Sequence, residues 1–231
     1  MDGLKTPRTK LRRLPARGAH DRATLDAILD AGLIAHMGFV HDGQPYVIPT
    51  LHARRGDEVL IHGSSASRAL RALAAGAPLC LTVTLIDGLV LARSAFHHSV
   101  NYRSVVLLGA ARLLESAGEK AAALEAFAER MVPGRWESIR PPTAKELRAT
   151  KVLVLPIGEA SAKIRTGGPK DDDDDYALDA WAGVVPVGLA FGAPEPDALL
   201  RDGIAVPDHV ARLSGPQTSS RSGRDDATRA G

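Results

Sequence analysis

The chain has 231 residues, 45% of them hydrophobic and 24% charged, which are ordinary proportions for a globular protein with one full core. Its formal net charge of +2 is too small to attract nucleic acid or an anionic membrane, so neither is an expected partner. There is no apolar run of membrane-spanning length, and the single cysteine, Cys80, excludes an internal disulfide. We therefore expect a cytoplasmic protein.

Composition divides the chain into three parts. Residues 1–17 form a basic arm without hydrophobic periodicity, and residues 18–213 are expected to form one domain with a C-terminal extension. Residues 214–231 are rich in Ser, Arg, Gly and Asp and lack large apolar side chains, which predicts a disordered tail. The acidic run at residues 171–175 predicts a solvated loop rather than a cation site, because adjacent carboxylates repel one another and cannot all point one way.

A helix followed by a hairpin opens the domain. Asp21 is a typical helix N-cap, the apolar residues after it recur at helical spacing, and Gly32 helps to end the helix. Two apolar segments, residues 33–40 and 45–51, flank the pair Asp42-Gly43. An Asp-Gly pair between apolar runs is typical of a tight hairpin turn, so both segments are predicted strands.

Residues 59–70 are predicted to run from a strand through a polar turn into a helix, and this pattern indicates an anion-binding site. Gly63 allows a turn that other residues take at a cost, and Ser64 or Ser65 can cap the helix. Hydroxyls from Ser64, Ser65 and Ser67, free backbone N–H groups and the guanidinium of Arg68 would all suit a phosphate. The alternative, a serine-capped helix with a solvated arginine, stays open.

The middle of the chain is rich in strand signals. Residues 79–85 and 89–94 are predicted strands joined by a turn at Asp87-Gly88. A loop over residues 96–102 leads into a long β-rich run over residues 103–114, in which a glycine is compatible with a bulge.

Two helices and two strands complete the predicted domain. Residues 119–131 have an amphipathic helical pattern with Met131 on the apolar face, and Thr143 can cap a short helix over residues 144–149. Residues 151–157 and 161–165 are the last predicted strands. Antiparallel strands outnumber helices, so the fold class is mainly β with peripheral helices, and a closed or split barrel fits better than a βαβ sheet.

The order of these motifs resembles the pyridoxamine 5'-phosphate oxidase-like family, and within it the flavin-nucleotide-binding branch that includes nitroimidazole-resistance proteins. Residues 47–50, 61–68, 96–106 and 161–169 carry the resemblance, which covers about residues 12–186. It implies an FMN-binding split β-barrel, usually a homodimer with flavin at the subunit interface. The C-terminal substrate-phosphate arginine and histidine pattern of the true oxidases is not found, so the resemblance does not imply oxidation of pyridoxamine phosphate.

Taken residue by residue, the resemblance implies a set of FMN contacts. Residues 47–50 would run along the isoalloxazine ring, with Thr50 at a polar flavin contact, and Ser67 and Arg68 match the pair that grips the phosphate. Arg103 and Ser104 match polar contacts from the long strand. The implied cofactor-binding residues are Val47, Ile48, Pro49, Thr50, Ile61, His62, Ser64, Ser67, Arg68, Arg103 and Ser104.

The loop over residues 96–102 gathers polar and aromatic groups and is predicted to line the substrate side of the flavin. His98 and Tyr102 are the catalytic candidates, because an imidazole near a flavin can donate a proton or hold an anion. Neighbours in an extended loop face opposite ways, so at most one of His97 and His98 points inward, and a structural or surface histidine stays the alternative. A haem would need a ligand from His36, His52, His62, His97 or His98, but they lack the short HxxxH spacing, and no metal site is predicted.

The sequence therefore predicts an FMN-binding oxidoreductase in which a reduced nicotinamide or similar donor reduces the flavin and a small molecule is the substrate. A non-catalytic flavin or haem carrier or sensor is the alternative, because no acid–base pair is evident. A deazaflavin-dependent reductase is a third possibility, since related barrels accept either cofactor.

Overall fold

The computed structural model describes residues 4–214, so the predicted tail beyond Ser214 lies outside the described residues. The chain divides into two compact units, Met1–Gly188 and Leu189–Gly231, and the first contains the whole sheet. The strands are β1 Gly18–Ala19, β2 Ile34–His41, β3 Gln44–Arg55, β4 Glu58–Ser64, β5 Pro78–Leu91, β6 Ser99–Ala110, β7 Arg112–Leu113, β8 Thr150–Pro156, β9 Ala160–Arg165 and β10 Gly183–Pro186. The α-helices are α1 Arg22–Ala31, α2 Arg68–Ala74, α3 Ala117–Met131, α4 Ala144–Ala149 and, in the second unit, α5 Asp208–Ala211.

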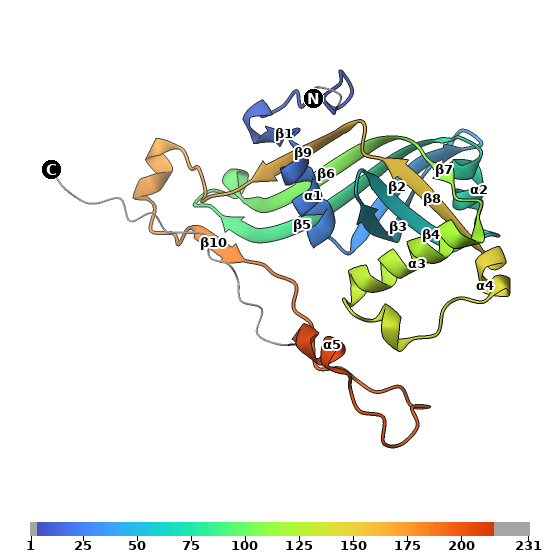
Figure 1. Cartoon of the computed structure of the whole chain (residues 1–231). Coiled ribbons are helices and arrows are strands. Elements are labelled where there is room, and N and C mark those ends of the chain that lie inside the picture. The colour runs from blue at the N-terminus through green and yellow to red at the C-terminus, as the bar shows by residue number, and fades with distance from the viewer. Residues whose placement is uncertain (1–3, 215–231) are drawn as a thin grey trace. The chain divides into compact units, whose positions relative to one another are not determined.

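Every strand pairing in the described residues is antiparallel. The strand order is β1-β9-β6-β5-β2-β3-β4-β8-β7, with β10 added beside β5. The sheet curls back on itself because β6 pairs with β9 and then continues into β7, which pairs with β8 (Figure 1). The predicted mainly β barrel with peripheral helices is therefore confirmed. None of the helices in residues 4–214 has the length and hydrophobicity needed to cross a bilayer.

The barrel is split along β3. Residues 44–51 of β3 pair with β2, but its pairing with β4 begins only at His52, which faces Ile61. Beyond that point β4 turns away and pairs with β8 as far as Ser64. The β4-facing edge of residues 45–51 is consequently not paired by any described strand, and its backbone groups can bind a ligand.

The barrel core is made of leucine, isoleucine and valine side chains from alternating strand positions, with α1 packed against it. Leu25, Ile28 and Leu29 of α1 are at most 1% exposed, so each contributes on the order of 2 kcal/mol by leaving water. A second cluster forms where Phe127 of α3 packs on β4 and β8. Met131, predicted on the buried face of α3, is exposed because the helix ends at this residue.

Local sequence signals correctly predicted the starts of two helices and the position of one hairpin turn. Asp21 caps α1, Thr143 and Glu146 form a reciprocal capping box at α4, and both caps were predicted to begin helices. Asp42 and Gly43 have φ angles of 51° and 75°, as a two-residue hairpin turn between β2 and β3 requires.

The predicted turn at Asp87-Gly88 is wrong. The pair lies inside the single strand β5, where the register with β6 shifts between Ile86 and Gly88, which marks a bulge. The strand does not turn here because β6 pairs with it on both sides of the bulge and β10 pairs with residues 88–91. A Cβ atom at Gly88 would stand 2.9 Å from Val184 Cγ1, so the glycine allows β10 to pack closely.

The predicted loop over residues 96–102 is shorter than expected. A short 3-10 helix, Ala95–His97, occupies its start, and β6 begins at Ser99, so Tyr102 is a strand residue. Gly109 is not a bulge, because the register with β5 is unbroken there; its missing side chain leaves room for Leu155, whose Cδ1 would be 3.0 Å from a Cβ atom.

Candidate flavin site at the split of the barrel

Two serine hydroxyls lie between the end of β4 and the start of α2. The Ser64 Oγ atom accepts a hydrogen bond from the Ala66 amide at 3.2 Å, and the Ser67 Oγ atom accepts one from the Leu70 amide at 3.4 Å. Each hydroxyl keeps its own proton to donate to a ligand. Gly63 does not have a positive φ angle, so the expected conformational reason is wrong; a Cβ atom there would stand 2.9 Å from Leu70 Cδ1, and the glycine is needed for space.

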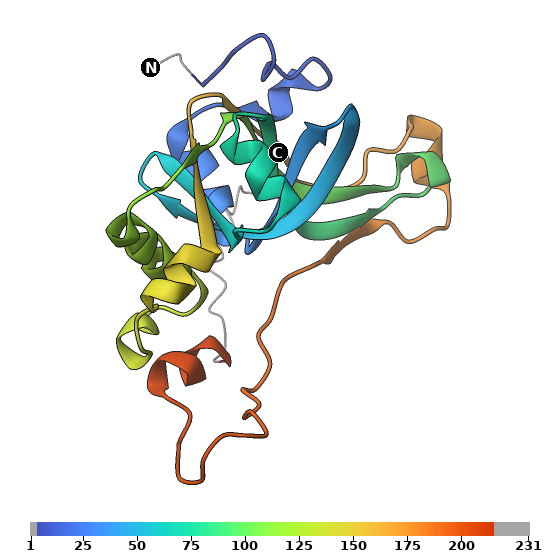
Figure 2. The same ribbon diagram turned by 90° about the vertical axis from the view of Figure 1, so that its right-hand side faces the viewer.

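The Arg68 side chain lies over the ring of Tyr46, with its guanidinium carbon 4.5 Å from the ring centroid. Arg68 is exposed, and no carboxylate in residues 4–214 pairs with it. Stacking uses the flat face of the guanidinium and leaves the N–H groups at its edge free to bind an anion. Nothing in the sequence near Tyr46 indicates this contact, because only the folded chain brings β3 close to the start of α2 (Figure 2).

The resemblance places residues 47–50 along the flavin ring, and they lie on the edge of β3 that β4 leaves unpaired. Val47 and Pro49 are exposed, whereas Ile48 packs toward the core. Thr50 is half-buried, and its hydroxyl donates to the Leu51 carbonyl at 3.1 Å. The segment can therefore offer backbone groups and two apolar side chains to a planar ligand.

Ile61 and His62 of β4 have side chains that pack inside the protein. Ile61 is fully buried, and the His62 ring lies 4.2 Å from the Phe127 ring. The His62 Nδ1 atom is buried without a hydrogen-bond partner among the described residues, and burial lowers the pKa of this imidazole. Any contact between these residues and a ligand at the open edge of β3 would involve their backbone.

Arg103 and Ser104 are engaged on β6. Arg103 donates to both carboxylate oxygens of Asp87 at 2.8 to 3.2 Å, and the Ser104 hydroxyl donates to the Lys163 carbonyl at 3.3 Å. Both residues lie in the part of β6 that pairs with β9, before the chain continues into β7 and reaches β8, the neighbour of β4. One chain therefore does not pair these residues with the strand that leads to Arg68.

The histidine-containing segment before β6 faces the acidic run. His98 is exposed, and its Nδ1 atom lies 2.9 Å from the Ser94 carbonyl, while Tyr102 is half-buried. The His97 Nε2 atom lies 3.4 Å from Asp172. The acidic run is therefore not uniformly solvated: Asp172 is exposed, but the Asp171 side chain is fully buried and accepts two hydrogen bonds from Arg93, both 3.0 Å.

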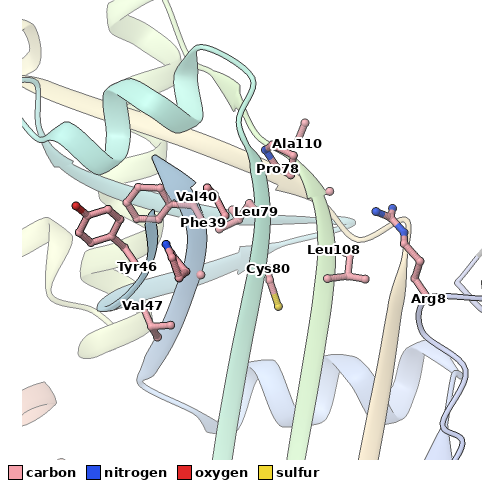
Figure 3. A pocket seen from close by; sticks show the side chains of 13 residues that line it. Arg8, Phe39, Val40, Tyr46, Val47, Pro78, Leu79, Cys80, Leu108 and Ala110 are labelled. Carbon is pink, nitrogen blue, oxygen red and sulfur yellow. The ribbon is translucent and has the colours of Figure 1, made fainter. Parts of the chain in front are cut away.

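Tyr46 is one of the residues that line a pocket of about 670 Å³ (Figure 3). Its walls come from the ends of β2, β3, β5 and β6 and are mainly apolar, and Arg8 is the only charged residue among them. Cys80 is half-buried and lines this pocket. A pocket of this size and polarity suits a flat organic molecule.

The model of the family described as pyridoxamine 5'-phosphate oxidase matches residues 21–164. This chain belongs to that family. The flavocytochrome Anf3 from Azotobacter vinelandii is 45% identical, and the match covers 90% of this chain and 97% of that one with a TM-score of 0.86. The FAD and heme binding protein from Mycobacterium smegmatis is 41% identical, with coverages of 86% and 98% and a TM-score of 0.83. No curated protein matched the chain.

The resemblance to nitroimidazole-resistance proteins is also supported at the level of the fold. A structure of such a protein from Bacteroides thetaiotaomicron is 20% identical and has a TM-score of 0.55 over 64% of this chain and 86% of that one. The expected family and its split-barrel fold are thus confirmed.

Proposed function

We propose that the chain is a flavin-binding oxidoreductase that holds the FMN half of its cofactor at the split of the barrel. The observation that carries the proposal is Arg68, whose guanidinium is stacked on Tyr46 and has no carboxylate partner among residues 4–214, beside the hydroxyls of Ser64 and Ser67. An unpaired guanidinium with neighbouring hydroxyl donors suits a phosphate. FMN is the first candidate, and FAD, named for the Mycobacterium smegmatis relative, contains the same FMN half.

The residues of the chain would bind and orient the cofactor rather than perform the chemistry. Arg68, Ser64 and Ser67 would donate hydrogen bonds to the phosphate, and the open edge of β3 would offer backbone groups to the ring. The flavin itself would supply hydride and electron transfer from a reduced nicotinamide or similar donor to a small molecule. His98 and Tyr102 remain the proposed residues on the substrate side.

The experiment is purification under native conditions followed by absorbance spectroscopy. A flavin spectrum that bleaches on addition of NADPH supports an oxidoreductase, whereas one that does not bleach supports a carrier or sensor. Chromatography of the heat-released cofactor then separates FMN, FAD and a deazaflavin. A colourless protein that takes up neither FMN nor FAD during incubation would refute the proposal.

A second candidate is a flavocytochrome that binds haem in addition to flavin. The observation that favours it is the extent of the comparisons: the two relatives named for a cytochrome or for heme match 90% and 86% of the chain, well past the end of the family model at residue 164. The nitroimidazole-resistance structure matches only 64%. The segment after β9 is thus shared with the relatives whose names include a haem group.

Two of the five candidate histidines fit an axial haem ligand. His36 is exposed on the sheet face beside the apolar pocket. The His97 Nε2 atom is buried and makes no hydrogen bond with a described residue, although Asp172 lies 3.4 Å from it. His52 does not fit, because it is 1% exposed and its Nε2 atom contacts the Leu29 carbonyl at 2.9 Å. A bound haem would supply one-electron chemistry.

Titration with hemin tests this candidate. We expect a Soret band that is lost in His36→Ala or His97→Ala but kept in His98→Ala, whose imidazole already contacts a carbonyl. Binding that survives all three substitutions would exclude both proposed ligands, and the absence of a Soret band in the wild type would remove the candidate.

We also propose a homodimer with the flavin at its interface. The exposed face of β2 and β3 is strongly apolar, since Ile34, Val40 and Val47 all point outward and Val47 is 70% exposed. A second copy would cover this face and bring its own β6 toward the open edge of β3. We expect a dimer by light scattering and a folded monomer for Val47→Asp. A wild-type monomer with bound flavin would contradict the proposal.

A further inference from the structure

Three aligned side chains run from the core to the surface beside the candidate phosphate site. Phe39 on β2 and Tyr46 on β3 are direct register partners, and their rings stack with centroids 5.6 Å apart and planes inclined by 21°. Arg68 then lies over Tyr46, with its guanidinium carbon 4.5 Å from the ring centroid. We call this set the Phe39–Tyr46–Arg68 stack; its two rings are shown in Figure 3.

The stack is fixed at its inner end and free at its outer end. Phe39 is 4% exposed and belongs to the main core cluster, and Tyr46 is half-buried and packs against that cluster. The two rings therefore have little freedom to move. Arg68 is exposed and, in residues 4–214, has no carboxylate or carbonyl partner that would hold its side chain. Tyr46 is consequently the contact that defines where the guanidinium lies.

We propose that Tyr46 is a positioning residue that holds the Arg68 guanidinium ready for the flavin phosphate. A free arginine side chain loses rotamer freedom when it binds an anion, and that loss weakens binding. The ring of Tyr46 attracts the cation to its face and restricts it before the ligand arrives. Because the ring contacts only the face, the N–H groups at the edge remain available for charge-assisted hydrogen bonds.

The aromatic ring, rather than the phenol hydroxyl, performs this role. The Tyr46 hydroxyl has no hydrogen-bond partner among the described residues, whereas both flanking contacts, with Phe39 and with Arg68, involve the ring. Tyr46→Phe should therefore keep the position of Arg68. Tyr46→Leu should lose it while keeping apolar volume against the core.

The inference rests on the proposed flavin site and is tested by a double-mutant cycle on the full chain. FMN is titrated into apo-protein prepared from wild type, Tyr46→Phe, Tyr46→Leu, Arg68→Ala and the double variant of Tyr46→Leu with Arg68→Ala. Circular dichroism and thermal unfolding check that each variant is folded. If Tyr46→Leu is unstable, Tyr46→Met replaces it, because methionine fills irregular space in a core.

We expect the dissociation constant to rise about two- to fivefold in Tyr46→Leu, as for loss of an exposed cation–π contact, and to stay at the wild-type value in Tyr46→Phe. In the Arg68→Ala background Tyr46→Leu should add nothing, because there is no guanidinium to position. This inference, but not the proposed flavin site, would be overturned if Tyr46→Leu weakened FMN binding equally with and without Arg68. It would also be overturned if the wild type bound FMN and Tyr46→Leu bound it with the same affinity. A folded wild type without FMN affinity would overturn the proposed site itself.

Discussion

Replacing Arg68 with alanine should lower the affinity for flavin strongly while changing the stability of the fold little. The Arg68 side chain is exposed, and its one described contact is the face of Tyr46, so its removal should change the free energy of unfolding by no more than about 1 kcal/mol. Charge-assisted hydrogen bonds to a phosphate are worth roughly 1.5 to 3 kcal/mol. That range corresponds to a dissociation constant raised roughly ten- to a hundredfold.

The assay is titration of apo-protein with FMN, followed by quenching of flavin fluorescence at several salt concentrations. Arg71→Ala is the matched control, because Arg71 is an exposed arginine on the same helix and no ion pair of its side chain is found in residues 4–214. Affinity should fall only in Arg68→Ala, and the variant should also show a weaker dependence on salt, since a phosphate contact has been removed. Unchanged affinity in Arg68→Ala, or an equal loss in Arg71→Ala, would refute the phosphate assignment.

Three further predictions concern the strand bulge, the buried histidines and the substrate side. Gly88→Ala should destabilise the fold by about 1 to 3 kcal/mol and expose β10 to limited proteolysis, because its Cβ atom would meet Val184 at 2.9 Å; Gly158→Ala, with open space around it, is the control. Burial lowers the pKa of His52 and His62 below the ordinary value of 6.5, so unfolding takes up protons below that pH. The free energy of unfolding should thus have its highest value above pH 6.5 and fall as the pH decreases below it. In His52→Gln the free energy of unfolding should depend less steeply on pH, and an unchanged dependence would argue against a contribution from His52. His98→Ala should leave the flavin content near wild type and alter the rate at which an electron acceptor reoxidises the reduced protein; unchanged rates with every acceptor would remove its proposed role.

The sequence alone determined those features that depend on a few neighbouring residues. Asp21 and Thr143 accept hydrogen bonds from the backbone of the helices that they begin, and Asp42-Gly43 provides the positive φ angles of a hairpin turn. Such signals act within four residues of the chain and need no tertiary partner. The order of these elements was also enough to indicate the family and its barrel.

The tertiary structure decided everything that depends on which segments meet. Asp87-Gly88 carries the same dipeptide signal as Asp42-Gly43, yet it forms a bulge, because strands on both sides of β5 continue past it. Tyr46 carries no local sign of a role near phosphate, since Arg68 comes from a helix that begins after another strand. The same amino-acid pattern thus has different outcomes when the pairing of distant strands, rather than local backbone preference, determines the lower free energy.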